Sequence, residues 1–177
     1  MTTISDEVSK KIRNVPDFPK PGIQFKDITP LFQDPQLVSD MVKAMAEQWK
    51  NKGLSGVAGV ESRGFLLGPL LAQELGLPFH LIRKKGKLPA ETWEASYDLE
   101  YGSASIEMHK GAVGKGDQIL IHDDLLATGG TVKAAVQLLA QAEAQCAGFS
   151  FIVELDFLAG GEELRKQGYQ VESLVHY

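Results

Sequence analysis

Apolar and polar residues follow two different rhythms along this chain, and the change comes at Gly53. Before Gly53 the spacing is helical. It predicts an amphipathic helix over 5–15 and a second helix that starts with Asp34 as N-cap and Pro35 in its first turn. Residues 16–30 contain four prolines between these helices, and this density of proline favours an extended, ordered loop.

After Gly53, short apolar runs alternate with helical stretches. The runs that predict strands are 56–60, 77–82, 103–109, 118–122, 149–155 and 171–176. The stretches that predict helices are one that ends near Leu75, then 131–145 and 161–167. Strands that alternate with helices predict the α/β class, with a mostly parallel, twisted sheet flanked by helices.

Two polar segments directly follow predicted strands. They are "ESRG" (61–64) and "DDLLATGGT" (123–131). In open α/β sheets, ligands bind beyond the carboxyl ends of the strands. We therefore expect both segments at the same edge of the sheet, with the ligand site beside them.

Length and composition predict one domain over 1–177, with 44% hydrophobic residues to form a core. Eighteen basic and twenty-three acidic residues leave a net charge of −5, which argues against nucleic-acid or membrane-surface binding. Cys146 is the single cysteine and is predicted to be a small buried residue. No run suits a membrane span or a signal peptide, so we expect a cytoplasmic protein.

The turn "ATGGT" (127–131) has the composition of a phosphate site. It fits neither the P-loop pattern nor the dinucleotide fingerprint. Gly129 and Gly130 permit left-handed or tight backbone angles, so that successive N–H groups can converge on one anion. Thr128 and Thr131 add hydroxyl donors, and the predicted helix contributes its positive end. A phosphate monoester suits this turn.

Asp123 and Asp124 precede the turn, where two negative charges would repel a bare phosphate. Two acids are expected here if the ligand carries hydrogen-bond donors, and the vicinal hydroxyls of a sugar can each donate a hydrogen bond to one carboxylate. A divalent metal bound by the same ligand would relieve the remaining charge. The pair and the turn together predict a ribose that carries a 5′-phosphate. The plainer alternative is an ordinary strand-to-helix turn with Asp124 as a local cap.

The stretch "HDDLLATGGT" (122–131) resembles the phosphoribosyl pyrophosphate (PRPP) signature of type I phosphoribosyltransferases. Four further stretches narrow the resemblance to the adenine branch of that family: "FPKPGIQFKDITP" (18–30), "ESRGF" (61–65), "LIRKKGKLP" (81–89) and "ASYDLEYG" (95–102). The resemblance implies an N-terminal hood over 1–33 and a flexible lid loop over 90–102. It also implies transfer of the phosphoribosyl group of PRPP to adenine, giving AMP and pyrophosphate, with Mg²⁺ held mainly by PRPP and water. A homodimer is implied as well.

The resemblance also implies a role for each site residue. It assigns the ribose to Asp123 and Asp124, and the 5′-phosphate to Ala127, Thr128, Gly129, Gly130 and Thr131. It assigns the pyrophosphate to Ser62, Arg63, Arg83 and Lys87, the last two near a neighbouring subunit's site. It assigns adenine to Gln24, Phe25, Lys26 and Leu125. Catalysis falls to Glu100, which would relay a proton at adenine N7, and to Tyr101, which would shield the site.

Several alternatives stay open. Arg63 could simply pair with Glu61, Phe25 could belong to the core, and the cationic run could be a solvated loop. His122 stands where the family usually has an apolar residue, and we expect it to point away from the acids. The competing functions are a 6-oxopurine transferase, for which Lys133 is a candidate donor, a PRPP-sensing regulator and a plain interaction scaffold.

Overall fold

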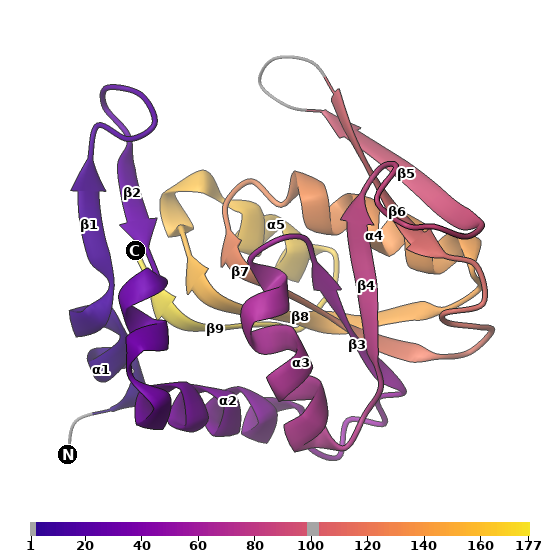
Figure 1. Ribbon diagram of the computed structural model, residues 1–177, viewed down its shortest axis with the longest axis horizontal. Helices are drawn as coiled ribbons and strands as arrows, with labels where there is room; N and C mark the ends of the chain where they lie inside the picture. Colours follow the sequence, from indigo (N-terminus) through magenta and orange to yellow (C-terminus); the bar gives the residue numbers. More distant parts are fainter. Residues whose placement is uncertain (1–2, 99–102) are drawn as a thin grey trace.

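The computed structural model describes residues 3–98 and 103–177, and its centre is a seven-stranded sheet (Figure 1). The strands are β3 (Gly56–Val60), β4 (Phe79–Lys84), β5 (Thr92–Asp98), β6 (Ser103–His109), β7 (Gln118–Leu126), β8 (Gln145–Glu154) and β9 (Val171–His176). Their order across the sheet is β5-β6-β4-β3-β7-β8-β9. The five strands from β4 to β9 in this order run parallel, and β6 pairs antiparallel with both β4 and β5. The predicted α/β class is confirmed.

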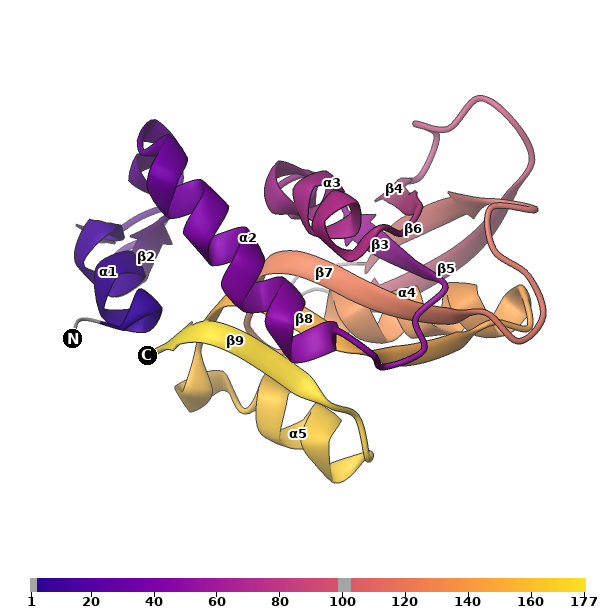
Figure 2. The ribbon, with the colours of Figure 1, turned by 90° about the horizontal axis from the view of Figure 1, so that it is seen from below.

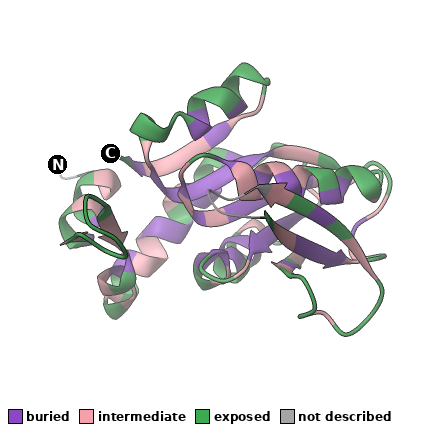
Figure 3. Cartoon of the chain, turned by 90° about the horizontal axis from the view of Figure 1, so that it is seen from above, coloured by how far each residue is buried: buried purple, intermediate pink, exposed green. Residues whose placement is uncertain are grey.

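Helices cover both faces of this sheet (Figure 2). α2 (Pro35–Trp49) and α3 (Gly64–Leu75) lie on one face, whereas α4 (Gly130–Gln141) and α5 (Gly160–Lys166) lie on the other. Each face has its own cluster of buried apolar side chains, and Figure 3 shows that burial is concentrated in the central strands. Among the described residues, no helix is both long enough and apolar enough to cross a membrane.

The N-terminal segment forms a separate layer beside the main sheet (Figure 1). It consists of α1 (Ile4–Lys11), β1 (Arg13–Pro16), β2 (Gln24–Asp27) and the 3-10 helix η1 (Thr29–Gln33). β1 and β2 form a two-stranded antiparallel ladder of their own. This is the region predicted as a hood, and we call it the hood below.

The prediction of a helix over 5–15 was wrong at its C-terminal end. The backbone leaves the helix at Ile12, with φ −65° and ψ 127°, and continues as strand β1. Val15 fits the helical spacing, but it pairs with Phe25 across the ladder instead. Arg13 Nε also donates to Asp27 Oδ2 at 2.9 Å, so a cross-strand ion pair holds the register. Tertiary pairing has overridden the local periodicity here.

Other boundaries also differ from the predictions. Within the interval 90–102, predicted as a loop, β5 pairs with β6 residue by residue from Thr92 to Asp98. Its alternating pattern was hidden by polar residues on the exposed face of an edge strand. β7 does not stop before the acids but runs on to Leu126. The predicted helix 131–145 ends at Gln141, and β8 begins at Gln145.

The start of α2 follows its prediction. The Asp34 side chain accepts a hydrogen bond from the N–H of Leu37 at 3.1 Å, and Pro35 occupies the first turn. Such a cap satisfies a backbone donor that has no partner inside the helix. The apolar face of α2 then covers the sheet with Leu37, Met41 and Met45.

Candidate active site

Asp123 and Asp124 lie near the carboxyl end of β7 and point to opposite faces of the sheet, as side chains in a strand do. Asp123 is half-buried and borders an open cavity, whereas Asp124 is 4% exposed. The Asp123 carboxylate accepts a hydrogen bond from the N–H of Asp124 at 2.8 Å. The acids therefore form part of a rigid strand rather than a loop.

Asp124 forms an ion pair with Arg63, the residue before α3. Arg63 Nε lies 2.7 Å from Asp124 Oδ2. The alternative that Arg63 pairs with Glu61 was therefore wrong, and so was the alternative that Asp124 caps a helix. Asp124 makes no cap contact with α4, whose N-cap is Gly129 without a side-chain hydrogen bond.

Both acids are held where a carboxylate loses its hydration. Burial raises the pKa of Asp123 well above its usual range, and the neighbouring charge of Asp124 raises it further. Burial also raises the pKa of Asp124, although the Arg63 guanidinium opposes this shift. The free site thus contains carboxylates that gain from any ligand that donates hydrogen bonds to them.

The turn 127–131 follows β7 directly and lines a cavity of about 290 Å³ together with Asp123. The other lining residues are Tyr97, Leu125, Leu126 and Val132. Gly129 has φ 82° and so adopts the left-handed conformation, which an L side chain rarely takes. This angle starts α4 with its N-terminus at the cavity, where backbone N–H groups favour an anion. All five residues predicted for the 5′-phosphate therefore lie at one cavity with Asp123.

The turn after β3 lies against the acids. A Cβ at Gly64 would be 2.8 Å from the carbonyl oxygen of His122 and 3.3 Å from Asp123 Oδ1. Only a glycine permits this approach, and it places Ser62 and Arg63 beside the end of β7. The peptide bond between Glu61 and Ser62 is cis.

Arg83 is committed to Glu61 rather than free. Its Nη2 donates to Glu61 Oε1 at 3.0 Å, its Nε lies 3.3 Å from Oε2, and the N–H of Lys84 donates to Oε2 at 2.9 Å. These partners hold the pKa of the Glu61 carboxyl below its usual range. Arg83 Nη1 also donates to the carbonyl oxygen of Lys87 at 3.0 Å. In this conformation Arg83 connects the turn after β3, which contains Glu61 and Arg63, to the turn after β4, which contains Lys85 and Lys87.

Glu107, on β6, holds the turn after β4 in place through hydrogen bonds to its backbone. Its Oε1 accepts the N–H groups of Lys87 and Leu88, each at 2.8 Å, and its side chain is buried. Burial alone would raise the pKa of Glu107, but hydrogen bonds from the backbone of Leu88, Gly86 and Lys87 outweigh it and lower the pKa. Sequence reasoning did not single out Glu107, because the alternation of this strand places it among the polar positions, on the opposite face from Ile106 and Met108.

The hood places an aromatic residue over this edge. The Phe25 ring lies 5.7 Å from the Arg63 guanidinium carbon and packs edge-on against Phe18. Lys26 turns away: its Nζ sits 3.4 Å from the centre of the Tyr177 ring and donates to Asn14 Oδ1 at 2.7 Å. Gln24 is exposed at the start of β2. The hood therefore brings Phe25 beside Arg63, whereas the Lys26 side chain is engaged by Asn14 and Tyr177.

His122 shares its strand face with Asp124, so the expectation that it points away from both acids was wrong. It is fully buried, and its Nδ1 lies 3.0 Å from the carbonyl oxygen of Ser150. Burial lowers its pKa to about 4, with the Ser150 carbonyl opposing, so the ring is neutral at neutral pH. Its Nε2 has no hydrogen-bond partner among the described residues.

The remaining predicted residues lie elsewhere or outside the described part of the chain. Glu100 and Tyr101, predicted as catalytic, fall within 99–102 and outside the described residues. Cys146 belongs to β8 and is partly exposed, not fully buried; burial of its thiol raises its pKa to about 12, which makes it unreactive. Tyr97 lines the cavity but was not predicted, because 90–102 was interpreted as a loop.

Comparison with known proteins agrees with this geometry. The family model for the phosphoribosyl transferase domain matches residues 33–175. The chain is 52% identical over 174 residues to the adenine phosphoribosyltransferase of Francisella tularensis subsp. tularensis, covering 97% of this chain and 98% of that one.

Solved structures show the same fold. The adenine phosphoribosyltransferase of Thermoanaerobacter pseudethanolicus superposes with a TM-score of 0.93 at 43% identity, covering 98% of this chain and 99% of that chain. The Saccharomyces cerevisiae enzyme, whose structure contains an imino-altritol bisphosphate and adenine, gives a TM-score of 0.91 at 38% identity, with 98% and 99% coverage.

Proposed function

Because the chain belongs to the phosphoribosyl transferase family, we propose that it transfers the 5-phosphoribosyl group of PRPP to adenine, giving AMP and pyrophosphate in purine salvage. One observation supports this most directly. Asp123 and the turn 127–131 border a single cavity, with the Asp123 carboxylate for a ribose hydroxyl and the N–H groups of the turn for a phosphate.

The protein would act by positioning and charge stabilisation. In the reaction, the C1–O bond to pyrophosphate breaks while adenine N9 attacks C1, so positive charge develops on the ribose. Asp123, beside the ribose, would stabilise that charge, and Arg63 and the turn at Ser62 would hold the departing pyrophosphate. For Arg83 and Lys87 to reach the pyrophosphate, Arg83 would have to exchange Glu61 for the ligand.

Adenine would stack on Phe25, with Leu125 on its other side. Phe25 sits on β2 beside Arg63, and Leu125 lines the cavity. The backbone of Gln24 and Lys26 would hydrogen-bond to the base edge and distinguish a 6-amino from a 6-oxo group. Backbone recognition suits this hood, because the Lys26 side chain is engaged by Tyr177 and Asn14.

Glu100 and Tyr101 complete the proposal from the resemblance alone. Glu100 would relay a proton at adenine N7, and Tyr101 would exclude water. Glu100→Ala should therefore lower kcat more than it changes KM for PRPP; the reverse result would make Glu100 a binding residue.

Magnesium would be held mainly by the diphosphate and ribose oxygens of PRPP and by water. The donors present fit this arrangement: Asp123 offers a hard carboxylate oxygen at the cavity, while Asp124 is engaged by Arg63. The described groups that could build a three-ligand site, Glu154, Asp156 and His176, lie apart from the cavity lining. Bound Mg²⁺ would neutralise charge on the diphosphate.

A homodimer in the cytoplasm completes the proposal. Three large apolar side chains are at least 40% exposed on α3 and β4: Leu66, Leu70 and Leu81. Leu81 lies on β4, which also carries Arg83, and Leu66 and Leu70 lie on α3, which directly follows Arg63; this suits a subunit contact near the pyrophosphate site. A single cysteine with a raised pKa fits a reducing compartment.

The rival 6-oxopurine specificity would call for a side-chain donor near the base. Lys133, the lysine that follows the turn, is engaged in this conformation by Glu163 on α5, with Nζ 2.6 Å from its carboxylate. The test is a product assay with PRPP, Mg²⁺ and each of adenine, hypoxanthine, xanthine and guanine. AMP from adenine alone supports the proposal, turnover of a 6-oxopurine overturns the base assignment, and PRPP binding without turnover favours a regulator.

A further inference from the structure

The short helix α5 begins directly against the phosphate turn. A Cβ at Gly160 would lie 2.0 Å from the carbonyl oxygen of Ala127 and 2.9 Å from the carbonyl carbon of Thr128. Both are backbone atoms, which cannot rotate aside as the end of a long side chain can. Position 160 is glycine because the turn occupies the space that a side chain would need.

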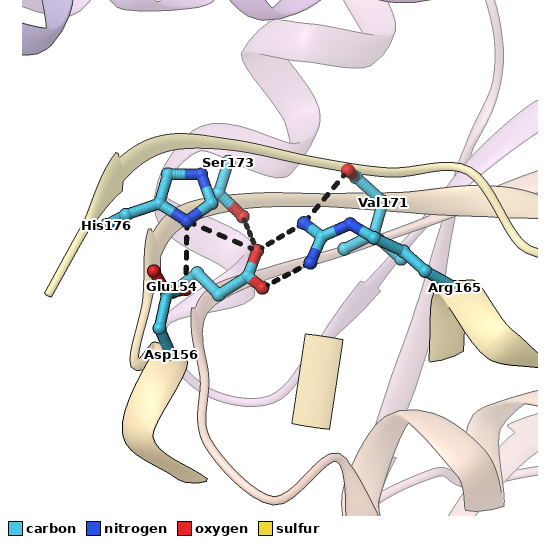
Figure 4. Close-up of polar contacts among 6 residues, drawn as sticks. All are labelled: Glu154, Asp156, Arg165, Val171, Ser173 and His176. Atoms are coloured by element: carbon cyan, nitrogen blue, oxygen red, sulfur yellow. Dashed lines mark hydrogen bonds and ion pairs between the residues drawn. The ribbon is translucent and has the colours of Figure 1, made fainter. Parts of the chain in front are cut away.

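The buried carboxylate of Glu154 anchors α5 in this place (Figure 4). Its Oε1 and Oε2 accept hydrogen bonds from Nη1 and Nη2 of Arg165, both at 2.7 Å, and the Ser173 hydroxyl donates to Oε2 at 2.9 Å. Arg165 also donates to the carbonyl oxygen of Val171 at 3.3 Å. The Glu154 side chain is 2% exposed. A two-pronged, buried contact of this kind holds a helix in one orientation.

Two consecutive glycines let the helix fit between the turn and its anchor. A Cβ at Gly161 would lie 1.8 Å from Glu154 Oε1, so Gly161 faces the carboxylate while Gly160 faces the turn. Lys133, on the helix that the turn opens, forms an ion pair with Glu163 on α5. The turn is thus supported by α5 from behind and has the open cavity in front.

A cation site is the other interpretation of this cluster, since Asp156 and His176 lie beside Glu154. His176 Nδ1 is 3.0 Å from Asp156 Oδ1 and 3.8 Å from Glu154 Oε2 (Figure 4). However, the bidentate contact of Arg165 already engages both oxygens of Glu154 and supplies the positive charge. The cluster is therefore a helix anchor.

We propose that α5, held by the Glu154–Arg165 pair, is a positioning element for the 5′-phosphate turn, with Gly160 as its point of contact. This inference rests on the proposed function, because the turn matters only if it binds the phosphate of PRPP. Hydrogen bonds from its N–H groups weaken steeply with distance and misalignment. α5 packs against the side of the Ala127–Thr128 peptide that faces away from the cavity, and so keeps this peptide at the cavity wall. These residues do not touch the ligand and act only through the turn.

The test compares Gly160→Ala with the matched control Gly148→Ala. A Cβ at Gly148 would also collide, at 2.4 Å from the Trp49 ring and 2.7 Å from the Gln170 carbonyl oxygen, but away from the cavity. For Gly160→Ala we expect KM for PRPP to rise about 10- to 100-fold, with KM for adenine changed by less than about twofold. For Gly148→Ala we expect a lower Tm and unchanged KM values.

An unchanged KM for PRPP in folded Gly160→Ala overturns the inference, and so does an equal rise in both variants. If Gly160→Ala does not fold, Glu154→Gln combined with Arg165→Met removes the anchor without leaving a buried charge. A selective rise in KM for PRPP then supports the inference, and wild-type values overturn it. If the wild type makes no AMP, the proposed function fails by itself; PRPP binding by calorimetry then carries the same comparison, and absence of PRPP binding overturns both.

Discussion

Arg63 Nε lies 2.7 Å from Asp124 Oδ2, so a cation from the end of β3 neutralises an acid near the end of β7 before any ligand is bound. The acid is 6% exposed at its side chain and the arginine 45%. PRPP would bring hydroxyl groups to the acid and phosphate oxygens to the arginine. In this conformation the two groups satisfy each other, so PRPP would have to replace part of this ion pair with its own hydroxyl groups and phosphate oxygens.

Arg63→Gln should raise KM for PRPP by about tenfold or more, because it removes a charge-assisted contact and leaves Asp124 without its cation. Stability should fall as well, because the variant leaves the buried Asp124 carboxylate without its cation. Steady-state kinetics and urea unfolding measure the two effects. Asp124→Asn should likewise weaken PRPP use strongly, and unchanged kinetics in both variants would remove the pair from the site.

Asp123→Asn should stabilise the free protein while it impairs PRPP use. The folded pKa of Asp123 lies above the unfolded value of about 3.8, so the folded state binds more protons in that interval. Stability is therefore lost as pH rises from about 4 through the folded pKa, and asparagine abolishes this loss. Unfolding curves at pH 4 and pH 7 should show the gain at pH 7 alone. A gain at both values would point to a packing effect instead.

His122→Leu should remove an acid-sensitive component of stability. Burial lowers the folded pKa of His122 to about 4 from 6.5. The unfolded state then binds more protons below pH 6.5, and stability is lost as pH falls from 6.5 to about 4, by about 3 kcal/mol in total. The difference in unfolding free energy between variant and wild type, followed over this range, checks it. A pH-independent difference would show that the ring does not become charged on unfolding.

Glu107→Leu and Glu107→Gln should differ sharply. Leucine removes the acceptor of the Lys87 and Leu88 N–H groups, which would leave the cationic turn without its anchor and raise KM for pyrophosphate in the reverse reaction. Glutamine keeps a carbonyl oxygen for both donors, so its KM should stay within about threefold of the wild-type value. Asp117→Ala serves as control, because it removes a carboxylate that accepts the Gly114 N–H, far from this turn. If glutamine is as harmful as leucine, the charge of Glu107 matters more than its position.

The hydrophobic pattern predicted the parallel core well and the edges poorly. β3 was predicted with its observed bounds, because Gly56–Val60 is buried at every position and bounded by turns. β1 and β5 were missed because each is short or polar and is defined by its partner strand: Val15 lies opposite Phe25, and Thr92 lies opposite His109. Pairing of this kind depends on distant residues, which a local pattern does not contain.

In the candidate site, too, residues that are adjacent in the sequence were predictable, and contacts between distant segments were not. Asp123 and the turn 127–131 were expected together, and they border one cavity because they are nearly contiguous; their roles toward a ligand stay predictions. The partners of the charged residues were not predictable: Arg63 pairs with Asp124 and Arg83 with Glu61, both across the sheet edge. Glu107 and Gly160 support the turns from behind, and their importance lies in contacts between segments far apart in the chain.

β7 runs without interruption from Gln118 through both acids to Leu126, and the phosphate turn follows at the next residue. The distance between the carboxylates and the phosphate donors is therefore set by covalent backbone in extended form. The strand therefore fixes how far apart these groups lie. A sugar phosphate with one more methylene between its ring and its phosphate would be too long to place its hydroxyls at Asp123 and its phosphate at the turn at the same time, so the extended backbone would set the length of the ligand that fits.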